Sequence, residues 1–188
     1  MNLLWHLIRK DLTALRLWLA ASGAFLWIRK RKVSDPAAAA GGLAYAFSLA
    51  FTAWLHYPIA YPQALLPWLA LAVEHVAEGR TGGVTRVTVA VAALALGGYP
   101  EGEFLAGAAG LCFFAAALVR AKRAPVPRLI SLAFAVALGF GLTAVVWLPQ
   151  VHAVLGSERS ARVERGTPPA AAPFSAGLLR RPPLYLDT

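Results

Sequence analysis

The strongest constraint on this chain is the placement of its charges: long apolar runs carry none, and clusters of charge end each run. No Asp, Glu, Lys or Arg lies between Asp35 and Glu74, and the same holds for residues 104–119 and 129–157. Of the 188 residues, 59% are hydrophobic and only 14% are charged, whereas soluble domains carry about a quarter charged residues. The pattern predicts an all-α protein, a polytopic transmembrane helix bundle.

The apolar runs predict a transmembrane helical domain, 1–155, followed by an irregular extracytoplasmic linker and tail, 156–188. Met1–Asp11 is typical of an amphipathic segment that lies in the interface. Asp35-Pro36 predicts a helix start with Asp35 as a cap. The helix that follows is rich in small residues, which favour close packing against another helix. The six spans are expected at about 12–28, 37–55, 63–76, 87–98, 104–119 and 129–148.

The lysines and arginines set the predicted orientation. They gather after spans one, three and five, whereas the loops after spans two and four hold none. The positive-inside rule therefore places the first set in the cytoplasm and both termini outside a bacterial inner membrane, although Arg9, Lys10 and the tail arginines favour the reverse. Topology then explains the net charge of +9 without nucleic acid. The cytoplasmic set is Arg29, Lys30, Arg31, Lys32, Arg80, Arg86, Arg120, Lys122, Arg123 and Arg128.

Three junctions that lack lysine and arginine face outside in this orientation: 56–58, 99–103 and 147–152. Each combines a proline near a helix end, an aromatic ring and a group that can bind a proton or a hydrogen-bond partner. Glu101 and Glu103 can act as general acid or base, or can hold a divalent cation through their oxygens. The candidates for lining a substrate cavity are Tyr99, Pro100, Glu101, Glu103, His56, Tyr57, Gln150 and His152.

Each of these residues also has an ordinary interpretation. The rings are typical of an aromatic belt at the headgroup level, and the histidines are typical of exposed loops. Glu101 and Glu103 can be solvated charges that favour a helix N-terminus. Glu74 and His75 are expected at the cytoplasmic interface. The single cysteine, Cys112, has no neighbour with metal-ligand spacing, so it predicts no metal site.

Two apolar stretches, 23–27 and 37–48, and three later motifs occur in an order that resembles the YfhO-like bacterial membrane proteins. The motifs are Leu65-Leu66-Pro67-Trp68, Gly98-Tyr99-Pro100-Glu101, and Leu148-Pro149 with Ser157-Glu158-Arg159. The resemblance covers about Leu12 to Arg162. Tyr99 stands where that family usually has a histidine.

That family is similar to the GT-C membrane glycosyltransferases. The resemblance therefore implies transfer of a sugar from a polyprenyl-phosphate donor on the extracytoplasmic face. It implies that Tyr99, Pro100 and Glu101 line the cavity, and it adds Arg159 to the candidates. GT-C enzymes usually carry a catalytic Asp in their first outer loop, which has no counterpart here. The resemblance thus predicts a piece of a longer parent chain, on which transfer depends, and it names no catalytic residue.

Two other classes of membrane protein remain open. Short spans that Gly and Pro interrupt, such as 87–98, are also typical of transporter or permease subunits. The ionisable residues lie at the ends of the spans, however, and a transporter would hold them at mid-membrane. A non-catalytic membrane assembly protein is the remaining alternative.

Overall fold

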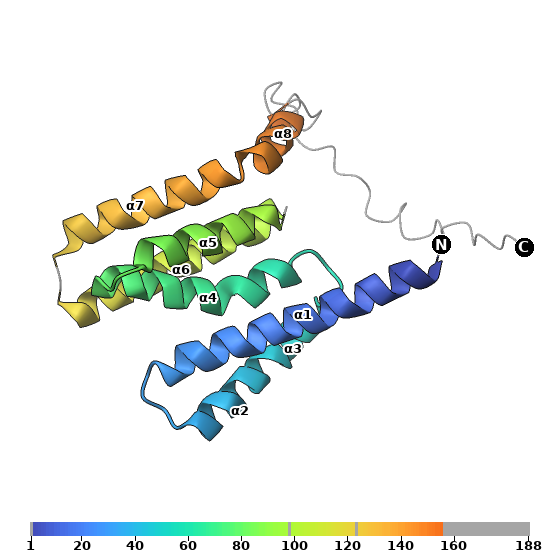
Figure 1. Ribbon diagram of the computed structural model, residues 1–188, viewed down its shortest axis with the longest axis horizontal. Coiled ribbons are helices and arrows are strands. Elements are labelled where there is room, and N and C mark those ends of the chain that lie inside the picture. The colour runs from blue at the N-terminus through green and yellow to red at the C-terminus, as the bar shows by residue number, and fades with distance from the viewer. Residues whose placement is uncertain (1, 98, 123, 156–188) are drawn as a thin grey trace, which may run out of the picture. The chain divides into compact units, whose positions relative to one another are not determined.

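A computed structural model describes residues 2–97, 99–122 and 124–155, with side chains described from Leu12 to Pro149 and at Val151 and His152. The predicted tail, 156–188, lies outside these residues. Within them the chain is all-helical and forms no strand, as the sequence predicts (Figure 1). The helices are α1 (Asn2–Arg29), α2 (Asp35–Ala46), α3 (Leu49–Thr52), α4 (Ala60–Glu78), α5 (Gly83–Leu96), α6 (Pro100–Ala121), α7 (Pro125–Leu142) and α8 (Ala144–Leu155).

The chain divides into two units, Met1–Trp147 and Leu148–Thr188. The first unit holds α1 to α7 and the beginning of α8. Its central helix is α4, which contacts α1, α5, α6 and α7, while α2 packs on α1 and α7 packs on α5 (Figure 1). One cluster of buried apolar side chains surrounds Leu69, Val73 and Val91, and a smaller one surrounds Phe51. The packing around α4 therefore decides which side chains meet at each end of this unit.

Proline and glycine set several helix boundaries. α6 and α7 begin at Pro100 and Pro125, because the fixed φ of proline suits the first helical turn. α4 ends at Glu78 and is capped by Gly79, whose φ of 71° is left-handed and costs glycine no strain. α2 begins near the predicted helix start, but Ser34 is the N-cap residue, and Asp35, predicted as the cap, is the first helical residue. The Asp35 carboxylate pairs with Arg29 at 2.9 Å instead.

Two of the intervals predicted as single helices are interrupted. The interval 37–55 holds both α2 and α3, because the Ser48 hydroxyl accepts a hydrogen bond from the Phe51 N–H at 3.3 Å and caps a new helix. The interval 129–148 holds most of α7 and the start of α8. Thr143 lies at this break and donates to the Gly139 carbonyl at 3.1 Å, a bond that often accompanies helix bending.

Three prolines lie inside helices. The sequence predicted that Pro62 and Pro149 would end helices, whereas Pro67 was expected within span three. Pro62 falls in the first turn of α4, where a backbone N–H has no intrahelical partner to lose. Consequently α4 begins three residues before the predicted start of span three. Pro67 lies within α4, and Pro149 lies within α8, so the helix continues through 149–152.

Small residues bring α1 and α2 together, as their frequency in the sequence predicts. Ala38, Gly42 and Ala46 form the buried face of α2. A Cβ added at Gly42 would lie 2.6 Å from the Ala21 carbonyl oxygen and 3.2 Å from the Phe25 backbone nitrogen. The two helix backbones thus approach more closely at this point than any larger side chain permits.

Two helices, α6 and α7, are long and apolar enough to cross a bilayer, judged by length and composition. Their large apolar side chains are mostly exposed, among them Phe104 at 77%, Val119 at 79% and Ile130 at 65%. Such an extended apolar surface is compatible with a membrane protein. α5 is apolar but shorter, and α2, with 12 residues, is about 18 Å long and cannot cross the hydrocarbon core by itself.

Candidate functional site

A cavity of about 410 Å³ lies at one end of the first unit, between α1, the connection from α3 to α4, and the end of α5. Its polar lining comes from Arg16, His56 and Tyr61, and the rest is apolar or glycine. His56 is one of the predicted cavity residues. The cavity is large enough for a small ligand or the head of a larger one.

Arg16 is the only charged residue in the lining of this cavity. Its guanidinium donates one hydrogen bond, from Nη1 to the Leu55 carbonyl at 2.8 Å, and the side chain is half-buried. A guanidinium has five N–H donors, and within the described part of the chain no carboxylate pairs with this one. The cavity is therefore positively charged and suited to an anion.

The acidic junction 99–103 follows α5 directly and begins α6. The Tyr99 hydroxyl donates to the Glu101 carboxylate at 3.2 Å, and the Tyr99 backbone N–H donates to Glu103 at 3.2 Å. The hydrogen bond to Glu101 raises the pKa of the Tyr99 phenol. Tyr99 therefore stays protonated at neutral pH and remains a hydrogen-bond donor to Glu101.

Two glycines allow the junction 99–103 to pack closely against residues beside the cavity. A Cβ at Gly97 would lie 2.4 Å from the Tyr61 ring, and a Cβ at Gly102 would lie 2.7 Å from the Tyr99 ring and 2.8 Å from Pro62. The start of α6 thus packs directly on the start of α4. Arg16 and His56 consequently lie at the same end of the unit as Tyr99 and Glu101.

The other predicted residues are not gathered in this cavity. Tyr57 is exposed, and its ring contacts Trp54 edge-on with the centroids 5.3 Å apart. His152 is exposed on α8 and belongs to the second unit. The side chain of Gln150 and the whole of Arg159 lie outside the described residues.

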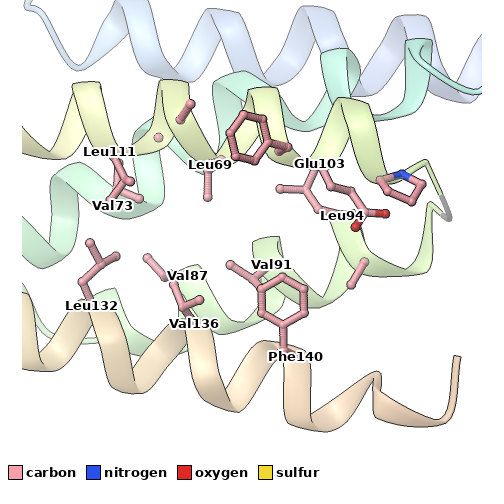
Figure 2. Close-up of a pocket in the computed structure, with 16 residues that line it drawn as sticks. Leu69, Val73, Val87, Val91, Leu94, Glu103, Leu111, Leu132, Val136 and Phe140 are labelled. Carbon is pink, nitrogen blue, oxygen red and sulfur yellow. The ribbon is translucent and has the colours of Figure 1, made fainter. Parts of the chain in front are cut away.

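Pro100 and Glu103 line a different cavity, of about 560 Å³, between α4, α5, α6 and α7. Figure 2 shows apolar side chains such as Leu69, Val91 and Phe140 along its length, with Glu103 toward one end. Glu103 is half-buried there, whereas Glu101 is exposed. The two carboxylates therefore occupy different surroundings, although the sequence predicts the same role for both.

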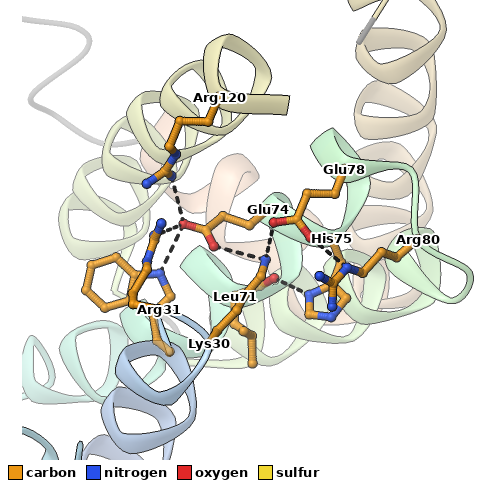
Figure 3. Close-up of polar contacts among 9 residues, drawn as sticks. Lys30, Arg31, Leu71, Glu74, His75, Glu78, Arg80 and Arg120 are labelled. Carbon is orange, nitrogen blue, oxygen red and sulfur yellow. Dashed lines mark hydrogen bonds and ion pairs between the residues drawn. The ribbon is translucent and has the colours of Figure 1, made fainter. Parts of the chain in front are cut away.

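A second polar cluster, the Glu74 cluster, is defined by Glu74 and the cations around it (Figure 3). The Glu74 side chain is only 1% exposed and pairs with Lys30 at 3.0 Å, with Arg120 at 3.2 Å and with Arg31. The Trp27 indole donates to the same carboxylate at 3.2 Å. Glu74 thus connects α1, α4 and α6.

Neighbouring groups extend the Glu74 cluster toward the surface. Glu78 pairs with Lys30 and with Arg80, both at 2.7 Å. His75 is buried, and its Nδ1 lies 2.7 Å from the Leu71 carbonyl, to which it donates. The basic loops that the sequence assigned to the cytoplasm therefore meet at one end of the unit. Glu74 and His75 are buried between helices, because these cations cover the carboxylate.

Among the described residues, no group of three or more His, Cys, Asp or Glu side chains lies close enough to hold a metal ion. The chain matches no family model, no curated protein and no solved structure.

Arg16 is predicted near the outer end of span one, where its long side chain can reach the interface, so it was not among the predicted site residues. An ionisable residue inside an apolar run is itself a reason to expect a functional site, and Arg16 lies within predicted span one. Tyr61 and Gly97 carried no comparable signal, because their place in the cavity depends on how α4 and α5 pack against α1.

Proposed function

We propose that this chain is part of an integral membrane glycosyltransferase that takes a sugar from a polyprenyl-phosphate donor on the extracytoplasmic face. The observation that carries the proposal is the cavity with Arg16 and His56, beside the paired Tyr99 and Glu101. A cationic cavity next to an exposed carboxylate supplies both requirements of the reaction. One is stabilisation of a departing phosphate, and the other is a proton acceptor.

In this reaction the bond between the anomeric carbon and the donor phosphate breaks while the acceptor oxygen bonds to the same carbon. The leaving polyprenyl phosphate gains negative charge, which the Arg16 guanidinium stabilises. The proton of the acceptor hydroxyl passes to the Glu101 carboxylate. Tyr99 positions Glu101 through its hydrogen bond of 3.2 Å.

The proposal includes the orientation of the chain in the bilayer. Six spans cross the membrane, with the Glu74 cluster at the cytoplasmic end and Arg16, His56 and Glu101 at the extracytoplasmic end. The support is the separation of charge: Lys30, Arg31 and Arg120 gather at one end, opposite the end that holds Tyr99 and Glu101. This distribution is typical of positive-inside topology.

Impermeant maleimide labelling tests this orientation. In a Cys112→Ala background, Glu101→Cys is expected to react in intact cells, because Glu101 is exposed at the extracytoplasmic end. The matched control is Lys122→Cys, just beyond the other end of α6, which should react only after lysis. The reverse result, in which Lys122→Cys reacts in intact cells and Glu101→Cys does not, contradicts the proposed topology.

Binding of a polyprenyl phosphate tests the role of Arg16. Arg16→Gln is expected to weaken binding to the purified full chain about tenfold, because a hydrogen bond to a charged group contributes about 1.5 kcal/mol or more. Ligand-dependent shifts of the thermal unfolding midpoint measure the affinity. Arg16→Lys keeps the charge and should recover part of the binding.

The control for that experiment is Arg29→Gln, which removes an exposed arginine at the opposite end of α1, where it pairs with Asp35. Its affinity for polyprenyl phosphate should equal that of the native chain. Equal affinities for Arg16→Gln and the native chain, or no binding by the native chain, would refute the proposal.

A further inference from the structure

A third cavity forms a groove of about 600 Å³ on the surface of the first unit. α1 and α5 form its walls, and α4 forms its floor. Its lining is almost wholly apolar and includes Trp18, Leu26, Leu65, Trp68 and Val89. Trp18 and Val89 are each more than 60% exposed, so the groove is open to whatever surrounds the unit.

Trp68 shapes the floor of this groove. Its indole N–H donates to the Leu19 carbonyl at 2.9 Å, and this bond fixes the ring against α1. Because the polar N–H is thereby satisfied, the remaining face of the ring is apolar. The lining residues of α5 extend from Thr85 to Ala93, which corresponds to about 12 Å along the helix. An extended hydrocarbon chain fits such a groove.

One end of the groove is cationic. Arg86 lines it and lies in the first turn of α5, which contains no acidic residue. Within the described residues no carboxylate pairs with Arg86, and its guanidinium is exposed. Lys30 and Arg80 do not line the groove and are paired with Glu74 and Glu78, so Arg86 is the charged residue of its lining.

We propose that this groove binds an anionic phospholipid, with an acyl chain along Trp18, Trp68 and Val89 and the phosphate at Arg86. The apolar lining accounts for the chain, and the Arg86 guanidinium accounts for the charge of the headgroup. A zwitterionic lipid fits less well, because its ammonium group would lie near the Arg86 guanidinium. Basic pockets at the cytoplasmic end of membrane helices recognise anionic headgroups by the same physics.

This inference does not depend on glycosyl transfer. The groove opens between α1 and α5, and its cationic residue is Arg86, whereas the proposed donor cavity contains Arg16 at the other end of the unit. Loss of polyprenyl-phosphate binding in Arg16→Gln and loss of phospholipid selectivity in Arg86→Gln are therefore separate results.

Tryptophan fluorescence with brominated lipids tests the proposal. The full chain is placed in nanodiscs of phosphatidylglycerol and phosphatidylcholine in which one or the other lipid carries bromine on its acyl chains. Trp18 and Trp68 line the groove, so a lipid bound there quenches their emission. The native chain is expected to favour phosphatidylglycerol, and Arg86→Gln should reduce this preference about fivefold.

Two further variants separate the headgroup from the chain. Lys122→Gln removes an exposed cation that does not line the groove and should leave the preference unchanged. Val89→Glu places a charge on the exposed wall and should weaken binding of both lipids. Inorganic phosphate and a glycerophosphoglycerol headgroup without acyl chains should not compete.

The outcomes decide between the proposal and its rivals. An unchanged preference in Arg86→Gln refutes recognition of the headgroup by Arg86. Binding that Val89→Glu does not affect refutes the acyl-chain groove. Competition by inorganic phosphate in the native chain shows a free-anion site, which also overturns the proposal.

Discussion

Glu74→Gln is expected to lower the free energy of unfolding by about 3 kcal/mol, because removing one partner of a buried ion pair leaves the others uncompensated. Glu74 is 1% exposed and is the carboxylate shared by Lys30, Arg31 and Arg120. Lys30 is only 13% exposed and would keep Glu78 as its remaining partner. Arg31 and Arg120 reach solvent more readily. The expected loss of unfolding free energy is therefore at the lower end of the range for buried ion pairs.

Thermal unfolding of the purified chain measures this effect. A loss of about 3 kcal/mol corresponds to a fall of about 6–12 °C in the midpoint for a chain of this size. The matched control is Asp35→Asn, whose ion pair with Arg29 has side chains 55% and 64% exposed. Exposed pairs contribute at most about 1 kcal/mol. If the two variants unfold at the same temperature, Glu74 does not hold the helices together.

The second large effect is expected at a glycine. Gly42→Ala should destabilise the fold by about 2 kcal/mol, because the added methyl overpacks the contact between α1 and α2. The new Cβ would lie 2.6 Å from the Ala21 carbonyl oxygen, which belongs to the backbone and cannot turn aside. The two helices must therefore separate.

Gly107→Ala provides a control for which the expected change in stability has the opposite sign. Gly107 lies within α6, is exposed, and has no atom within 4 Å of an added Cβ. Alanine is more favourable than glycine in a helix interior by up to about 1 kcal/mol, so this variant should be slightly stabilised. Unfolding midpoints of both variants, measured under one set of conditions, make the comparison. A stabilised Gly42→Ala would show that α1 and α2 do not pack as described.

The sequence predicted a helix start where a single residue with a strong local preference, such as proline, lies at that start. Asp35-Pro36 begins α2, because a proline near a helix start has a preferred conformation wherever it occurs. α6, in contrast, begins at Pro100, four residues before the predicted start of span five at 104. The break between α2 and α3 was not predicted. The Ser48 hydroxyl caps Phe51 there, and a serine in an apolar run can equally well continue a helix.

The candidate site was predictable to a smaller extent. His56, Tyr99 and Glu101 were found because proline and charge mark the ends of apolar runs. Arg16 and Tyr61 come from other helices, and only the packing of α1 against α4 brings them to the same cavity. Glu74 was expected at an interface, because its burial depends on Arg31 and Arg120, which lie more than 40 residues away in the chain.

Because the chain is synthesised from its N-terminus, the partners in the Glu74 cluster are made in a fixed order. Lys30 and Arg31 precede Glu74 by 44 and 43 residues, whereas Arg120 follows it by 46. Two cations therefore exist before the carboxylate is synthesised, and the third appears only when α6 is nearly complete. Glu74 can be neutralised by α1 as soon as α4 emerges, and α6 is the last of the three helices to join. The order of residues along the chain thus gives Glu74 cationic partners from the time α4 packs on α1.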